Sequence, residues 1–365
     1  ESGWHHEKQK AFRPLQLTDG CEGGKAFFIG LARRGAEMTF LEPCKKGEYF
    51  GTGQFHLRLL KTIPAQPQKK YLPAYLFEMV ANGQPVGRCT LRVGYNDLVE
   101  YAGNIGYEVE EEYRGHHYAL ISCRLLLRLA RRHRMEEVLI TCREDNFASR
   151  RTCERLGATP AGRVDVPVNH EMYRADSDAP LLQYRYRLGL ELRPVTEQEL
   201  VEVGKLYECV TADQLAGENY SGWDTEYPKE WTARELFAQG GLYGLFEQQT
   251  GQLVASAAYD SCFDSCYQQV SWSRTVEDEK LLCVHTLAVH PDWQGLGLGR
   301  RLMRFAQQQA QQSGMEGVRI DTWVGNLPGL HLYHRLGFAD VQTLQQDVHY
   351  EGDRTEYQFL EWYCR

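Results

Sequence analysis

Hydrophobic and polar residues follow two different periods along this chain, and together they predict an α/β protein with a mixed sheet. Short apolar runs rich in β-branched residues predict buried strands, as at 282–289 and 317–323. Apolar residues spaced three or four apart predict amphipathic helices, as at 118–132 and after Gly299. The second half of the chain has the predicted order β-α-α-β-β-β-α-β-α-β-β, a mixed sheet flanked by helices.

The remaining elements follow from the same patterns. Further strands are predicted at 54–61, 74–81, 86–93, 104–109, 138–142, 192–195, 242–246, 253–259, 338–344 and 356–363. Further helices are predicted at 25–34, 147–156, 197–210, 231–237 and 328–336. Asn82-Gly83 predicts a hairpin turn, and 262–272 is either irregular or an edge strand.

An internal repeat with an offset of 180 residues divides the chain. Val109 corresponds to Val289, and Arg155-Leu156-Gly157 corresponds to Arg335-Leu336-Gly337, with no gap over roughly 50 residues. A period of this length indicates two whole domains rather than a solenoid. We therefore expect an N-terminal extension of uncertain structure at 1–49, a first domain at 50–189 and a second domain at 190–365.

A glycine-rich turn joins the strand at 282–289 to the next helix. His290-Pro291-Asp292 ends the strand, and Gln294, Gly295, Gly297 and Gly299 follow. A strand, turn and helix in this order direct backbone N–H groups and the positive end of a helix dipole to one point, which favours an anion. The spacing fits neither the G-x-G-x-x-G fingerprint nor a P-loop. The alternative is a tight turn that needs glycine only for a positive φ.

Composition and charge narrow the classes of function. The 365 residues contain no run of 18 apolar residues and no apolar signal-peptide stretch. The eleven cysteines form no C-x-x-C pair or zinc-type spacing, so we expect reduced thiols, a cytoplasmic protein and no metal. Residues 190–365 hold 13 Lys and Arg against 26 Asp and Glu, whereas 1–189 hold 28 against 23. The acidic second domain should attract cations, and we expect neither a membrane nor a nucleic acid as partner.

Two motifs in the second domain resemble the GNAT superfamily of N-acyltransferases. Gln294, Gly297 and Gly299 fit Q/R-x-x-G-x-G/A, the pyrophosphate loop of that family. The second motif, N-x-x-x-x-x-L-Y-x-x-x-G-F, is present as Asn326, Leu332, Tyr333, Gly337 and Phe338. The resemblance implies two tandem GNAT folds, each a mixed α/β sheet that splays between its fourth and fifth strands and is flanked by helices.

The resemblance also implies acetyl-CoA as co-substrate and a role for each motif residue. Its pyrophosphate would accept hydrogen bonds from the backbone N–H groups of Gln294, Gly295, Leu296, Gly297, Leu298, Gly299 and Arg300. Its pantetheine arm would pair with the backbone of Leu287, Ala288 and Val289 like an added strand. Asn326 would bond the same arm, and Tyr333 would protonate the departing thiolate. The structural alternatives are a helix cap for Asn326 and a core tyrosine for Tyr333.

The resemblance gives several candidates for the group that takes a proton from the attacking amine. His285 lies two residues before Leu287, and H-x-L-A-V-H resembles the arylalkylamine branch of the family, where a histidine relays this proton. Alternation would place His285, Leu287 and Val289 on one face of the strand. Asp321 and Glu230 are alternative carboxylates, and a hydrogen-bonded core histidine is the structural alternative.

The first copy departs from both motifs. It has Arg114-Gly115-His116-His117-Tyr118-Ala119 at the loop, so that the Cβ of His117 could crowd a pyrophosphate, and Cys153 stands in place of Tyr333. Asn146-Phe147-Ala148-Ser149 is retained and resembles the ribosomal-protein N-acetyltransferase branch, where a nearby serine assists. We predict a degenerate domain that binds CoA weakly and transfers little.

The sequence thus predicts a tandem N-acetyltransferase whose second domain acetylates a small cationic amine by direct attack in a ternary complex. The acidic charge and the residues Trp223, Trp231, Trp272 and Trp323 favour a cationic acceptor. A protein N-terminal or lysine acetyltransferase and a non-catalytic acyl-CoA sensor or scaffold are the alternatives. The sequence is compatible with a homodimer, and it identifies neither the acceptor nor the acyl chain length.

Overall fold

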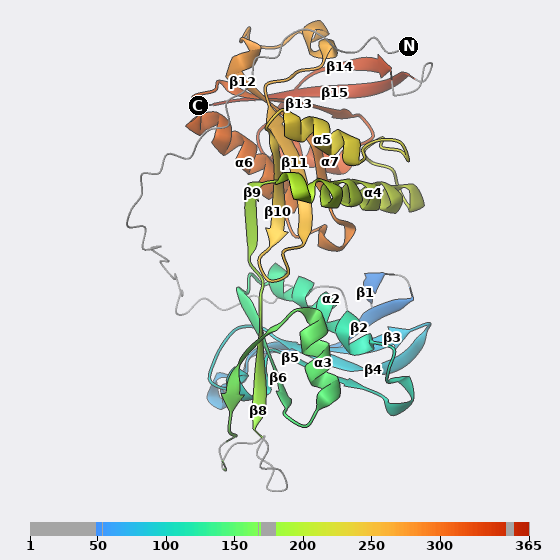
Figure 1. Cartoon of the computed structure of the whole chain (residues 1–365), viewed down its shortest axis with the longest axis vertical. Coiled ribbons are helices and arrows are strands. Elements are labelled where there is room, and N and C mark those ends of the chain that lie inside the picture. The colour runs from blue at the N-terminus through green and yellow to red at the C-terminus, as the bar shows by residue number, and fades with distance from the viewer. Residues whose placement is uncertain (1–48, 53, 167, 169–179, 348–353, 365) are drawn as a thin grey trace. The chain divides into compact units, whose positions relative to one another are not determined.

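The computed structural model describes residues 49–364 apart from 53, 167, 169–179 and 348–353. The helix predicted at 25–34 lies outside the described residues. The described chain forms two compact units, each with its own core (Figure 1). The first unit comprises 49–190 together with 247–251, and the second comprises 191–246 together with 252–364.

Among its described residues, the first unit contains two antiparallel sheets that do not pair with each other. One has the strand order β1-β2-β3-β4-β5 and the other β6-β8-β7. The strands are β1 (Tyr49–Thr52), β2 (Phe55–Ile63), β3 (Ala74–Ala81), β4 (Gln84–Arg92), β5 (Ile105–Val109), β6 (Glu137–Arg143), β7 (Thr159–Val164) and β8 (Leu181–Arg187). The helices are α1 (Val99–Ala102), α2 (Tyr118–Arg132) and α3 (Phe147–Leu156).

The second unit is built on one sheet with the strand order β14-β15-β13-β12-β11-β10-β9. Its strands are β9 (Leu190–Pro194), β10 (Leu242–Glu247), β11 (Leu253–Asp260), β12 (Leu281–Val289), β13 (Gly317–Trp323), β14 (Ala339–Asp347) and β15 (Arg354–Tyr363). Its α-helices are α4 (Leu200–Ala216), α5 (Glu230–Ala238), α6 (Leu298–Gln312) and α7 (Leu327–Arg335). β12 and β13 pair in parallel, whereas β11–β12 and β13–β15 are antiparallel.

Helices cover both faces of this sheet, which explains why every residue of β11 is buried. Ala258 packs in the cluster that contains Tyr207 of α4. The next residue, Tyr259, points to the other face, where its hydroxyl donates to the carbonyl of Leu302 in α6 at 3.1 Å. The apolar stripe of α6 is buried there, with Leu302 fully inaccessible to solvent. α4 and α6 therefore sandwich the central strands.

The structure confirms the mixed α/β fold and most of the predicted elements. The helices at 118–132 and 147–156 and the strand at 317–323 have their predicted bounds. α2 and α6, and likewise β6 and β13, are related by the 180-residue offset of the repeat. One prediction needs correction: α4 continues past 210 to Ala216 because no helix-breaking residue occurs before Gly217. Of the two alternatives for 262–272, the structure has the irregular one, with a short 3-10 helix, η4 (Ser265–Gln269), and no strand.

The turn that begins α4 is stabilised by a charged capping arrangement. Glu199 accepts hydrogen bonds from the Arg193 guanidinium at 2.6 and 2.9 Å and from the backbone N–H of Thr196 at 2.9 Å. The bonds from Arg193 and Thr196 outweigh the effect of partial burial and lower the pKa of Glu199 from 4.5 to about 2. The folded state therefore favours the ionised carboxylate.

We predict that Glu199→Gln destabilises the second unit at pH 7 by about 1–2 kcal/mol, because a charged cap is replaced by a neutral one. Since the folded pKa is depressed, the stabilisation is complete above pH 4.5 and is lost as the pH falls towards 2. The difference in urea-unfolding free energy between variant and wild type should shrink over that interval. An equal loss of unfolding free energy in the variant at pH 3 and pH 7 would show that the charge of the Glu199 carboxylate does not cause the stabilisation.

Candidate active site

β12 and β13 pair over only three residues each and then separate. Their register joins Leu281–Cys283 to Gly317–Arg319, and within the described residues no ladder continues beyond it. The divergence between the fourth and fifth strands of this domain opens a cavity of about 290 Å³. β12 supplies His285 and Leu287 to the cavity wall, and β13 supplies Asp321. The splay that the family resemblance implied is therefore present.

The glycine turn precedes α6 and is exposed to solvent. Gly295 has φ +74° and Gly297 has φ +79°, ψ +19°, a left-handed conformation that favours glycine. α6 begins at Leu298, and no side chain caps its N-terminus. Its first N–H groups therefore face outward and are available to an anion. A Cβ on Gly299 would lie 3.3 Å from Leu332 and 3.7 Å from Leu287, so this glycine brings the start of α6 close to the cavity wall.

A β-bulge in β12 corrects the expected alternation of side chains. Ala258 of β11 opposes His285, whereas Ser256 opposes Ala288, so β12 carries one extra residue between these pairs. Thr286 sits in the bulge with φ +46°, and its hydroxyl lies 3.1 Å from that of Tyr207 in α4. His285 therefore lies on the α4 face, while Leu287 lies on the α6 face near Gly299. The two residues do not share a face, because the bulge reverses the pleat between them.

His285 forms a pair with Asp260, a residue that sequence reasoning did not single out. The His285 Nε2 to Asp260 Oδ1 distance is 3.0 Å, and the Asp260 side chain is only 2% exposed. Burial by itself lowers the pKa of His285, but interactions with Cys283 and the Asp260 carboxylate outweigh it and raise the pKa well above 6.5. The buried carboxylate thus stabilises the imidazolium, and it makes His285 a stronger base than a free histidine.

Tyr333 and Asn326 reach the same cavity from α7. Tyr333 is 5% exposed, and burial followed by the Asp321 charge raises the pKa of its phenol, so that it stays protonated. Asn326 is the N-cap of α7: its Oδ1 accepts from the backbone N–H of Gly329 at 3.0 Å and its Nδ2 donates to Thr322 at 2.8 Å. Asn326 therefore has the capping role that was its structural alternative, and one N–H of its amide is left for a ligand.

The wall of the cavity is also aromatic and acidic. Trp223 and Tyr227 from the α4–α5 connection, Trp323 and Tyr357 line it beside Asp264 and Asp321. Burial raises the pKa of Asp321, the Tyr267 hydroxyl that donates to it at 2.5 Å opposes this, and the charge of Asp264 raises it further. Two carboxylates thus face the same space and repel each other, an arrangement that a cation would relieve.

Several sequence candidates lie elsewhere. Glu230 is paired with Arg234 on α5, Trp231 is 48% exposed, and Trp272 packs on Tyr267 and Phe359. None of these three side chains lines the cavity. Sequence reasoning missed Tyr227, Asp260 and Asp264. Asp260 ends β11 and Asp264 precedes η4, positions that carried no motif, so only their convergence in space identifies them.

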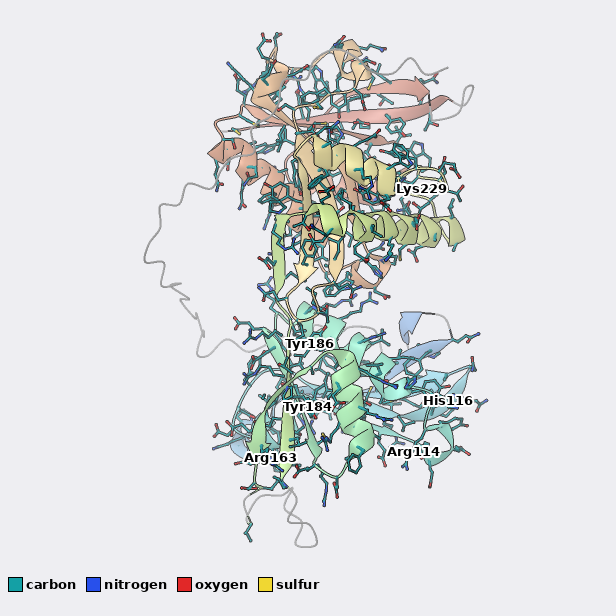
Figure 2. The ribbon with its side chains drawn as sticks, viewed as in Figure 1. Arg114, His116, Arg163, Tyr184, Tyr186 and Lys229 are labelled. Carbon is teal, nitrogen blue, oxygen red and sulfur yellow. The ribbon has the colours of Figure 1, made fainter. Side chains whose placement is uncertain are left out.

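The first domain contains a cavity of about 580 Å³ lined by β5, the start of α2 and α3. At the 180-residue offset, Tyr107 and Asn146 correspond to Leu287 and Asn326 of the second cavity, and most of the other lining residues correspond to the glycine turn, α6 and α7. His117 has φ +61°, ψ +18°, close to the conformation of Gly297, and it likewise precedes an uncapped helix. The loop therefore keeps its backbone form despite the loss of glycine. Figure 2 shows Arg114 and His116 on this loop. Cys153 is fully buried and does not line the cavity.

Family models match both domains. The model described as acetyltransferase (GNAT) family matches residues 210–338, and the model described as acetyltransferase (GNAT) domain matches residues 53–159. The two matches together cover well over half of the chain, which belongs to the GNAT acetyltransferase family and contains two of its domains in tandem.

Similar proteins match shorter segments. An uncharacterised N-acetyltransferase of Methanocaldococcus jannaschii is 28% identical over 20% of this chain and 33% of its own length. The streptothricin acetyltransferase of Streptomyces lavendulae is 33% identical over 21% of this chain and 42% of its own. The chain thus spans less than half the length of these relatives. The structure of yncA from Salmonella typhimurium with its cofactor acetyl-CoA is 17% identical. The match covers 48% of this chain and 93% of that chain, with a TM-score of 0.36.

Two further findings concern the described residues only. Within them, no three His, Cys, Asp or Glu side chains are grouped so as to hold a metal ion. No helix in this part of the chain has both the length and the apolar character needed to cross a membrane.

We predict that Asp260→Asn lowers the pKa of His285, because the imidazolium loses its buried counter-charge. The pKa is measured by following the His285 ring signals in an NMR pH titration. The matched control is Asp340→Asn, which removes the carboxylate 2.8 Å from the exposed His334 and should leave His285 unchanged. An unshifted His285 titration in Asp260→Asn would mean that the carboxylate does not set its protonation.

Proposed function

We propose that the second domain transfers an acetyl group from acetyl-CoA to the primary amine of a small cationic acceptor. The observation that supports this most is the shared cavity: a protonated phenol, a histidine–aspartate pair and two further carboxylates meet where β12 and β13 separate. Family membership supports the reaction class, and the cavity supports the choice of acceptor.

The residues present fit acetyl-CoA. The edge of β12 that faces the splay has no strand partner beyond Cys283 in the described chain, so its backbone groups at Leu287 and Val289 are free to pair with an amide-bearing arm. The backbone N–H groups from Gly295 to Arg300 suit a pyrophosphate, whereas that of Gln294 already donates to the carbonyl of Pro291 at 3.2 Å. A thioester held between these two features would direct its sulfur towards the cavity that contains Tyr333.

The acceptor end suits a small cation better than a protein chain. Aromatic faces and carboxylates both attract ammonium groups. The α4–α5 connection contributes Ser221, Trp223 and Tyr227 to the wall, and a cavity of about 290 Å³ has the size of a small-ligand site. A protein acetyltransferase would instead need an open groove for the flanking peptide.

Each protein group then has one task in a direct transfer. The amine nitrogen attacks the thioester carbon, and collapse of the adduct forms the C–N bond and breaks the C–S bond. His285, supported by Asp260, accepts the proton that the amine loses. The Tyr333 hydroxyl gives a proton to the departing sulfur, which leaves as CoA thiol. Because His285 must be neutral to accept a proton, the rate should rise with pH as the imidazolium deprotonates.

We predict that Tyr333→Phe lowers kcat by about ten- to a thousand-fold, the range expected for loss of general-acid assistance, with little change in the KM for acetyl-CoA. Free-thiol release with a panel of amines measures both parameters. Tyr259→Phe is the matched control, because it also removes a buried hydrogen-bonded phenol of this domain, outside the cavity. An unchanged kcat in Tyr333→Phe would remove this residue from the mechanism.

We also predict that Asp264→Asn raises the KM for a diamine by about tenfold or more, the size of one interaction with a charged group, while the KM for acetyl-CoA stays constant. Asp213→Asn, an exposed change on α4, is the control. The panel includes lysine-containing and N-terminal peptides. Efficient acetylation of peptides but not of diamines would favour a protein acetyltransferase, and no thiol release with any amine would favour a sensor.

A further inference from the structure

The first domain differs from the second in the placement of one phenol. At the 180-residue offset, Tyr107 of β5 takes the place of Leu287, and Cys153 of α3 takes the place of Tyr333. The second domain thus has leucine on the strand and tyrosine on the helix, whereas the first has tyrosine on the strand and cysteine on the helix. The phenol has moved from the helix on one side of the splay to the strand on the opposite side.

The relocated phenol lies in the large cavity of the first domain. Tyr107 lines the cavity, and its hydroxyl is 2.7 Å from the hydroxyl of Ser149, which also lines it. Ser149 is 8% exposed, and its backbone N–H donates to the cap residue Asn146 at 3.0 Å. Because α3 fixes the serine, the hydrogen bond orients the phenol. Burial raises the pKa of Tyr107, so the hydroxyl carries its proton at neutral pH.

The mouth of this cavity is more basic than the corresponding region of the second domain. Arg114, Arg151 and Arg155 line it, whereas the second domain has Gln294, His331 and Arg335 at the equivalent positions. Arg155 reaches across to His117, with its Nη1 3.0 Å from the Nδ1 of that ring. Three guanidinium groups beside an uncapped helix suit a ligand with several phosphates.

We propose that the first domain is a second acyl-transfer centre, which binds a CoA thioester and in which Tyr107, positioned by Ser149, replaces the missing proton donor at 153. The proposal rests on the proposed function of the second domain. It differs from the prediction of a degenerate copy, because the loop keeps its backbone form, a cavity adjoins the loop, and Tyr107 and Ser149 supply a hydroxyl pair where the second domain has Leu287 and Gly329.

The transfer step balances as in the second domain. The nitrogen lone pair of a primary amine forms the C–N bond with the thioester carbon, and the C–S bond breaks with its electron pair on sulfur. The Tyr107 hydroxyl gives its proton to that sulfur. The amine releases one proton to water, and the phenolate regains one through Ser149. No oxidant or further reactant is required.

The test uses the full chain in which Tyr333→Phe lowers the turnover of the second centre. Residual thiol release from acetyl-CoA is screened against the amine panel, and Tyr107→Phe is added. We expect the residual rate to fall by at least about tenfold, the lower limit for loss of a general acid. Tyr75→Phe is the matched control: Tyr75 is a fully buried phenol of the same domain, 3.0 Å from His133 and outside the cavity. It should leave the residual rate unchanged.

Calorimetric titration with CoA gives a readout that does not depend on turnover. The wild-type chain should bind two CoA molecules, and the double change Arg151→Glu and Arg155→Glu should leave one. Arg124→Glu, an exposed charge reversal on α2 outside the cavity, is the control and should retain two.

Three results would overturn the proposal: a single CoA per wild-type chain, no residual turnover in Tyr333→Phe, or a residual rate that Tyr107→Phe does not change. If the wild type is active, either of the first two results would leave the function proposed for the second domain intact. An inactive wild type would overturn both proposals.

Discussion

The short parallel contact between β12 and β13 is the constraint on which the second domain depends. Parallel strands normally pair along their length, and here the ladder stops at Cys283 and Arg319. The free edge of β12, the cavity and the approach of α7 all follow from that separation. Backbone groups without partners are costly when buried, which supports the proposal that the arm of the co-substrate pairs with this edge. The first domain shows the same constraint in stronger form, because β5 and β6 belong to different sheets.

The two domains carry the phenol beside this opening on different elements. In the second domain the phenol comes from the helix and the strand position is leucine; in the first the phenol comes from the strand and the helix position is a buried cysteine. Duplication leaves each copy free to make this exchange, although the strands beside the two openings differ: β12 pairs with β13 over three residues, whereas β5 and β6 belong to different sheets.

Electrostatics distinguish the two cavities as clearly as shape does. The second is lined by Asp264, Asp321 and His285, and His285 is paired with Asp260. The first is lined by arginines near the start of α2. The opposite net charges of the two halves of the sequence are therefore expressed at the cavities. Such a difference favours different acceptors at the two sites.

The sequence by itself determined the element order, the duplication, the glycine turn and the positions of Tyr333 and Asn326, because periodicity, glycine spacing and motif spacing are local properties. It could not show that the bulge at Thr286 separates His285 from Leu287, since the mostly apolar run LLCVHTLAV has no alternation in which one extra residue could be recognised. Nor could it show that Asp260, Asp264 and Tyr107 matter. These residues carry no motif, and their roles arise only when distant strands and turns are brought together, because contacts between them depend on the tertiary fold.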